Sequence, residues 1–212
     1  MKQIAYQELS HVLNYSDYRT LIDQLMEEGK TTGDNHSEAM LGYTKLNVSR
    51  MRRLDKTTRL TEETAAALKQ IDRPLVWLVL TEAWCGDAAQ IIPVLAKIAE
   101  ASPQLELKLI LRDEHLDIMD AFLTNNGRSI PKMIILDAET GDVLADWGPR
   151  PAVIQHAVME TKAIAEQTDD PEQAKAIWEE GKKDSQRWYA RDKTKSIQAE
   201  VVEVTIGASA LV

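Results

Sequence analysis

This chain has almost no cysteine, because its 212 residues contain only one, Cys85. A single cysteine excludes both an intrachain disulfide and a cysteine-rich zinc site, and it agrees with a reducing compartment. Any chemistry at Cys85 must therefore be that of a lone thiol.

Long apolar runs are also missing. No stretch of the sequence approaches the roughly 18 consecutive apolar residues that span a bilayer. The first residues lack an apolar segment followed by a small-residue cleavage site, which a secretory signal would have. We therefore expect a cytoplasmic protein without a membrane partner.

Positive charge is in deficit, with a formal net charge of -9. Nucleic acid is not an expected partner, because phosphate binding needs a dominant basic surface. The histidines are dispersed and show no metal-ligand spacing, so we expect no metal and no cofactor. The 44% of hydrophobic residues excludes a disordered chain and is typical of a globular protein.

The hydrophobic pattern divides the chain into three parts. Residues 1–70 are predicted to form an N-terminal helical extension packed on the core, with Ser16 and Thr61 as helix N-caps and Gly29 as a stop signal. Residues 71–168 are predicted to form an α/β domain. Residues 169–212 are predicted to form a C-terminal helix and a tail, in which residues 199–206 are either an edge strand or part of the tail.

The central part has an α/β order of elements. Leu75 to Leu80 is a continuous apolar run, typical of a strand that is covered on both faces. The expected elements after it are a helix, a second strand, a second helix, a hairpin and a closing helix, over residues 87–101, 105–111, 115–125, 133–147 and 151–168. This order predicts a mixed sheet.

The sequence Trp84-Cys85-Gly86-Asp87-Ala88 directly follows the apolar strand, and Pro93 lies inside the next helix. The loop Gly127-Arg128-Ser129-Ile130-Pro131 precedes the hairpin, and Gly148 follows it. In these positions the chain resembles the thioredoxin superfamily over roughly residues 73–168. The resemblance implies a thioredoxin-like three-layer fold with a mixed central sheet, extended by the N-terminal helices and a C-terminal helix. It also implies a cis peptide bond at Ile130–Pro131.

The resemblance assigns Cys85 as the catalytic nucleophile, in a groove formed by Trp84, Gly86, Asp87, Ile130 and Pro131. A cysteine in the first turn of a helix meets free backbone N–H groups that favour the thiolate. The negative charge of Asp87 opposes ionisation, and a small, buried, unreactive cysteine is the alternative. In this fold we expect the strand-to-helix junction to be exposed and Trp84 to be partly exposed.

Two departures from the thioredoxin pattern limit the activity. Ala88 stands where the family has its second cysteine, so Cys85 cannot resolve its own mixed disulfide. Val79 stands where ordinary thioredoxins carry a buried carboxylate that assists proton transfer. Both departures argue against a general dithiol reductase.

Three functions stay open on this basis. The first is a monothiol thiol-disulfide oxidoreductase in cell redox homeostasis, acting on a protein or a low-molecular-weight thiol or disulfide, with an external thiol resolving the intermediate. The second is a redox-inactive binding or scaffold protein. The third is an iron–sulfur carrier of the monothiol glutaredoxin type, although the sequence lacks the glycine-rich segment expected after that cysteine.

A basic run from Lys45 to Arg59 stands out in this acidic chain. A helix over this run has to bury Leu46, Met51 and Leu54 against the sheet domain. Its arginines could then stabilise a Cys85 thiolate or hold an anionic thiol similar to glutathione, whereas a solvated basic face is the alternative. The arginines in question are Arg50, Arg52 and Arg53.

Overall fold

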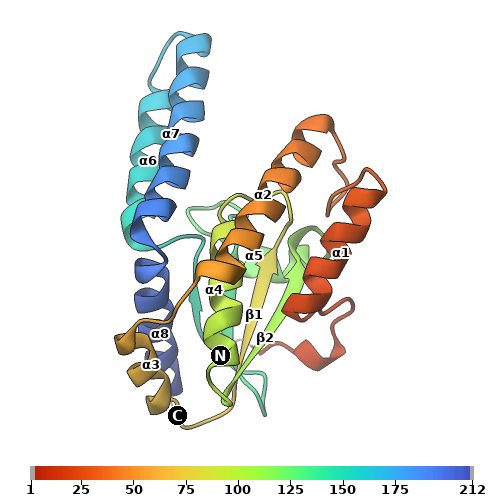
Figure 1. Ribbon diagram of the computed structural model, residues 1–212, viewed down its shortest axis with the longest axis vertical. Coiled ribbons are helices and arrows are strands. Elements are labelled where there is room, and N and C mark those ends of the chain that lie inside the picture. The colour runs from red at the N-terminus through yellow and green to blue at the C-terminus, as the bar shows by residue number, and fades with distance from the viewer. Residues whose placement is uncertain (1–2, 211–212) are drawn as a thin grey trace.

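The computed structural model describes residues 3–210, and its centre is a four-stranded mixed sheet (Figure 1). The strands are β1 (Leu75–Thr81), β2 (Leu105–Leu111), β3 (Lys132–Asp137) and β4 (Val143–Trp147). Their order across the sheet is β2-β1-β3-β4, with β1 parallel to β2 and the other neighbours antiparallel. The expected mixed sheet and hairpin are therefore confirmed.

Helices surround this sheet, with α4 in front of it and α5 behind it in Figure 1. In the described residues, the α-helices are α1 (Tyr15–Glu27), α2 (Glu38–Thr57), α3 (Glu62–Ala67), α4 (Ala88–Glu100), α5 (Leu116–Ala121), α6 (Ala152–Glu166), α7 (Pro171–Asp192) and α8 (Lys195–Ser209). Short 3-10 helices cover Tyr6–Glu8, Leu68–Gln70 and Arg112–Glu114. No helix of the described chain is both long and apolar enough to cross a membrane.

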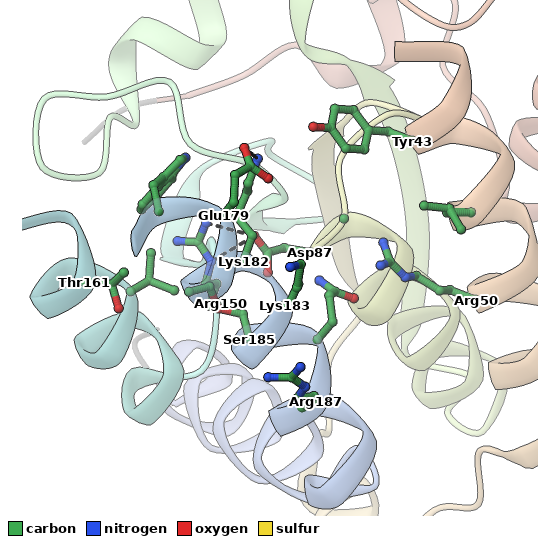
Figure 2. Close-up of a pocket in the computed structure, with 16 residues that line it drawn as sticks. Tyr43, Arg50, Asp87, Arg150, Thr161, Glu179, Lys182, Lys183, Ser185 and Arg187 are labelled. Atoms are coloured by element: carbon green, nitrogen blue, oxygen red, sulfur yellow. Dashed lines mark hydrogen bonds and ion pairs between the residues drawn. The ribbon is translucent and has the colours of Figure 1, made fainter. Parts of the chain in front are cut away.

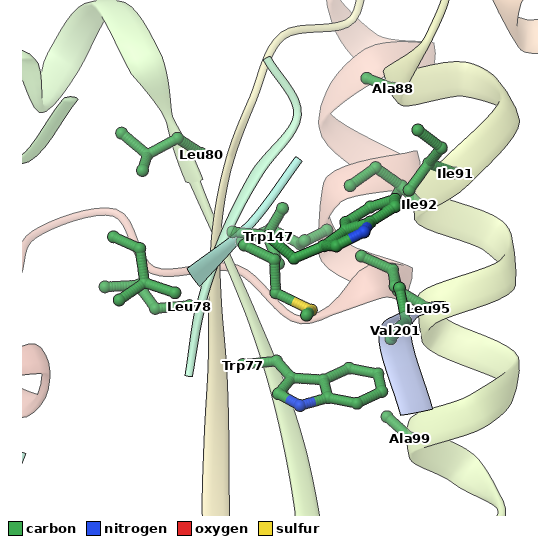
Figure 3. Packing of buried hydrophobic residues seen from close by; sticks show 14 of the residues in the cluster. Trp77, Leu78, Leu80, Ala88, Ile91, Ile92, Leu95, Ala99, Trp147 and Val201 are labelled. Atoms are coloured by element: carbon green, nitrogen blue, oxygen red, sulfur yellow. The ribbon is translucent and has the colours of Figure 1, made fainter. Parts of the chain in front are cut away.

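Every residue of β1 is buried, as expected for a strand with cover on both faces. Successive side chains of a strand point to opposite faces, and Figure 3 shows Trp77 facing α4 while Leu78 and Leu80 face away from it. The buried stripe of α4, which includes Ile92 and Leu95, packs against the Trp77 side. This core fixes the end of β1 and the start of α4, where the cysteine motif lies.

The N-terminal helices pack on this core. Tyr18 of α1 and Met51 of α2 are each 1% exposed, and Leu54 is 6% exposed. The expectation that Leu46 is buried is wrong, because Leu46 is 55% exposed. The predicted N-cap Ser16 is also wrong, since Asn14 caps α1 by accepting the Asp17 amide, whereas Thr61 caps α3 as predicted.

The second helix of the α/β domain is shorter than the predicted 115–125. α5 ends at Ala121, and Asn125 and Asn126 adopt positive φ angles. Thr124 and Gly127 then exchange two backbone hydrogen bonds. A compact turn stabilised by these asparagines therefore replaces the last part of the predicted helix.

The C-terminal part differs most from expectation. The predicted closing helix forms as α6, but Ile154 is its only buried described residue, and α6 pairs with α7 in a hairpin that extends away from the sheet (Figure 1). The predicted edge strand or tail at 199–206 is wrong, because this segment is part of helix α8.

Helix α8 covers the sheet beside β4 and α4. Its buried residues include Gln198, Val201, Val202 and Thr205, which recur at the spacing of one helical face. The buried residues of this segment therefore follow the period of a helix and not the two-residue period of a strand. Lys193 and Thr194, both at positive φ, turn the chain from α7 into α8.

Candidate functional site

The cysteine motif lies at the junction between β1 and α4, as the sequence predicts. Cys85 precedes α4 by one turn, and its Sγ accepts a hydrogen bond from the Ala88 amide at 3.4 Å. The thiol donates to the carbonyl oxygen of Ile130 at 3.3 Å, and the Ile130–Pro131 peptide bond is cis. The loop before β3 and the cysteine are thus in direct contact.

The Cys85 thiol is not exposed as expected, because only 8% of the residue is accessible. The pKa of Cys85 is raised to about 12, mainly by burial and to a smaller degree by the charge of Asp87. The backbone amides of Ala88 and Asp87, and the guanidinium of Arg150, lower that pKa by a smaller amount. Desolvation of the thiolate therefore outweighs the helix N-terminus, and Cys85 is a protonated thiol at neutral pH.

Asp87 is tied into the structure by residues far away in the sequence (Figure 2). Its Oδ2 accepts a hydrogen bond from Nε of Arg150 at 2.8 Å, and the two groups form an ion pair with side chains 14% and 19% exposed. Its Oδ1 accepts a hydrogen bond from the Tyr189 hydroxyl at 2.9 Å. Asp87 thus joins α4 to the segment after β4 and to α7.

Helix α7 makes further contacts with the motif. Gln90 of α4 donates from Nε2 to Oε1 of Gln186 on α7 at 2.8 Å. A Cβ placed on Gly86 would lie 3.3 Å from Nε2 of the same Gln186 and 3.4 Å from Nη1 of Arg50. Glycine at this position therefore allows α7 and α2 to approach the motif closely.

The remaining predicted groove residues are only partly accessible. Trp84 is half-buried, with the guanidinium carbon of Arg112 4.8 Å from its ring centroid. Ile130 is 5% exposed, and Pro131 is buried as well. The predicted site residues therefore lie together, but they form a closed site rather than an open groove.

The basic run lies on α2, partly on its exposed face and partly on the face that borders the cysteine motif. Arg52 pairs with Asp23 on α1, while Arg53 donates to Oε1 of Gln90 at 3.2 Å. Arg50 donates to Oδ1 of Asn47 at 2.8 Å, and Asn47 in turn donates to the carbonyl oxygen of Ala83 at 2.8 Å. These contacts connect α2 to the motif loop.

The cation that opposes Asp87 at the thiol is not one of the predicted arginines of α2. We expected Arg50, Arg52 or Arg53 to favour the Cys85 thiolate, whereas Arg150 is the arginine whose charge lowers the Cys85 pKa. Arg150 directly follows Pro149, whose peptide bond with Gly148 is cis, but its position in the sequence does not predict a contact with the motif. The sequence around Tyr189 does not indicate its contact with Asp87 either, since Tyr189 lies in a polar helix about a hundred residues away.

Sequence reasoning also missed a buried carboxylate. Glu82 is fully buried, and its Oε1 accepts the backbone amide of Asp113 at 3.0 Å. Burial raises the pKa of Glu82 to about 7, with a smaller contribution in the same direction from the charge of Asp113. Among residues 3–210, no group of three or more His, Cys, Asp or Glu side chains is arranged to hold a metal ion.

Comparison with protein families agrees with this geometry. The family described as Thioredoxin matches residues 33–168. The chain belongs to this thioredoxin family. The match includes helix α2 and the Cys85 motif, and it ends two residues after the last residue of helix α6.

Solved structures support the same fold for this thioredoxin-family chain. A crystal structure of a protein of unknown function from Pseudomonas aeruginosa aligns with a TM-score of 0.54 at 19% identity, over 88% of this chain and 97% of that one. An HIV epitope scaffold aligns with a TM-score of 0.50 at 19% identity, over 86% of this chain and 95% of that one. No curated protein matches. These similarities establish the fold, and an activity has to be argued from the geometry of the site.

Proposed function

We propose that this thioredoxin-family chain acts as a binding protein in which Cys85 does not turn over substrate. The observation that carries the proposal is the closure of the motif by helix α7, through Tyr189 on Asp87 and Gln186 on Gln90. A substrate disulfide has to reach the sulfur of a thiolate, and Cys85 is both covered and protonated. The absence of a second cysteine at Ala88 points in the same direction.

A monothiol oxidoreductase is the second candidate, and one observation favours it. The Cys85 thiol keeps its contact with the Ile130 carbonyl next to the cis-Pro131 bond, at 3.3 Å. In that case an external thiol would resolve the mixed disulfide, and α7 would have to move away from the motif first. The binding function needs no such movement.

The two candidates differ in the rate at which Cys85 attacks a small disulfide. The native protein is mixed with excess dipyridyl disulfide at neutral pH, and release of the thione is followed by absorbance. We expect the native chain to react at least about a hundredfold more slowly than the same chain unfolded in guanidinium, because burial keeps the thiol protonated. A native rate equal to or above the unfolded rate contradicts the binding function.

The Ala88→Cys variant provides the matched test of turnover. It restores the second cysteine of a dithiol site without changing the contacts of Asp87. If the motif is closed, this variant should remain inactive in the reduction of insulin by a thioredoxin reductase system. Turnover well above that of the wild-type chain would instead support an oxidoreductase that lost only its resolving thiol.

A further inference from the structure

A cleft of about 610 Å³ lies between α2 and α7 and opens beside Gly86 and Asp87 (Figure 2). We call it the α2–α7 cleft. Its walls come from α2, from α7 and from the side of α6 that faces α7. The volume is in the range of a site for a small organic molecule.

One wall of the α2–α7 cleft is a stripe of α2 formed by Tyr43, Leu46 and Arg50. These positions recur at the spacing of one helical face, so the three side chains lie one above another. Tyr43 is 41% exposed and Leu46 is 55% exposed, although both are large apolar residues. The opposite wall includes Trp178 and Val158, so the cleft has apolar surface on both sides.

The cations of the cleft differ in their partners. Arg150 is paired with Asp87, and Lys182 is paired with Glu179 at 2.5 Å. On the rim, Lys183 and Arg187 pair with the α7 carboxylates Glu180 and Asp184. These cations are therefore already neutralised.

Arg50 is different, because no carboxylate of residues 3–210 lies within ion-pair distance of its guanidinium. Its guanidinium donates a hydrogen bond to the neutral amide of Asn47. The side chain is half-buried, and burial lowers the pKa of Arg50, with the nearby Asp87 charge opposing that shift. Figure 2 shows Arg50 pointing from α2 into the space in front of α7. A partly desolvated guanidinium without a bound counter-charge is a favourable site for an anion.

We propose that the α2–α7 cleft binds a small organic anion that carries an apolar body. The anionic group, a carboxylate, sulfonate or phosphate, pairs with the guanidinium of Arg50. The apolar body lies between Leu46 and Trp178. The inference gives a ligand class to the proposed binding function and rests on it, but no step of it requires Cys85 to be inert.

Anilinonaphthalene sulfonate is the probe that matches this chemistry, and N-phenylnaphthylamine has the same rings without the charge. We expect the sulfonate to bind the native chain with a stoichiometry of one, with an increase in its fluorescence. The Arg50→Gln variant should weaken that binding roughly tenfold, as expected for one charge-assisted contact, and should leave the neutral probe unchanged. The Arg50→Lys variant should retain most of the binding because it keeps the charge.

Two further variants locate the site. Leu46→Ser should weaken both probes, because Leu46 contributes apolar surface to the cleft and is 55% exposed. Arg52→Gln is the matched control, since Arg52 lies on the same helix but pairs with Asp23 outside the cleft, and it should bind both probes like the wild-type chain. Circular dichroism of each variant checks that it is folded.

Three results would overturn the proposal: no saturable binding of the sulfonate, equal affinity in Arg50→Gln and wild type, or an equal loss in Arg52→Gln. The Cys85→Ser variant separates this inference from the proposed function. Binding that persists in Cys85→Ser, together with fast disulfide attack by wild-type Cys85, would contradict the non-redox function and leave the anion site standing.

Discussion

The Asp87→Asn substitution tests how the motif is held closed. It removes the charge that faces Arg150 but keeps an oxygen that accepts the Tyr189 hydroxyl. The partners are 14% and 19% exposed, so solvent screens their attraction only in part. At an effective dielectric of about 20, two unit charges separated by about 4 Å attract by about 4 kcal/mol.

Part of that attraction is offset in the wild-type chain, because burying the carboxylate costs solvation energy. We therefore expect Asp87→Asn to lower the free energy of unfolding by about 2–4 kcal/mol, since it leaves the buried guanidinium of Arg150 without its counter-charge. The measurement is urea unfolding followed by far-ultraviolet circular dichroism. Asp184→Asn is the control, because its pair with Arg187 is exposed, and it should unfold like the wild-type chain.

The Asp87→Asn substitution also tests what raises the pKa of Cys85. Asp87 raises the pKa of the thiol, but burial is the larger cause, so the pKa in Asp87→Asn should fall and still exceed that of a free thiol. An unchanged unfolding free energy would refute the role of the Asp87–Arg150 pair. A Cys85 that becomes reactive at neutral pH in this variant would show that charge, and not burial, suppresses it.

Three further predictions concern the fold around the site. The pKa of Glu82 is raised from 4.5 to about 7, so between these pH values the folded chain binds a proton that the unfolded chain has lost. The free energy of unfolding should therefore fall by about 3 kcal/mol as the pH rises from about 4.5 to about 7. Urea unfolding of Glu82→Gln at several pH values should not show this fall. Val201→Ala should cost roughly 2 kcal/mol because Val201 is fully buried in α8, whereas Val153→Ala on exposed α6 should melt like the wild-type chain in thermal denaturation. Gly148→Ala should strongly lower the melting temperature, because Gly148 has φ +119° and a Cβ would lie 2.4 Å from the Pro131 carbonyl oxygen; a melting temperature near that of the wild-type chain would contradict this reasoning.

The parts of the fold that depend on local pattern were predictable from the sequence. The apolar run of β1 determines a doubly covered strand, and the motif that follows it determines where Cys85 lies. Thr61 was also predictable as a cap, because a cap depends only on its own first turn.

The closure of the site was not predictable, because it depends on contacts between distant segments. Nothing near Tyr189 or Arg150 indicates that their side chains meet at Asp87. The 55% exposure of Leu46 likewise depends on the cleft between α2 and α7, which local pattern does not predict. The burial that raises the pKa of Cys85 is a property of the folded chain, and the local sequence gives only the opposing effects of the helix N-terminus and Asp87.

The rate of alkylation of Cys85 by iodoacetamide, measured against pH, tests the central claim most directly. The chain has a single cysteine, so every adduct found by mass spectrometry reports on this thiol. A closed motif predicts a slow rate at neutral pH that keeps rising with pH and reaches no plateau below about pH 10, since burial raises the pKa of Cys85 to about 12. A plateau below about pH 8 in the folded chain would mean an exposed thiolate, and it would contradict the account.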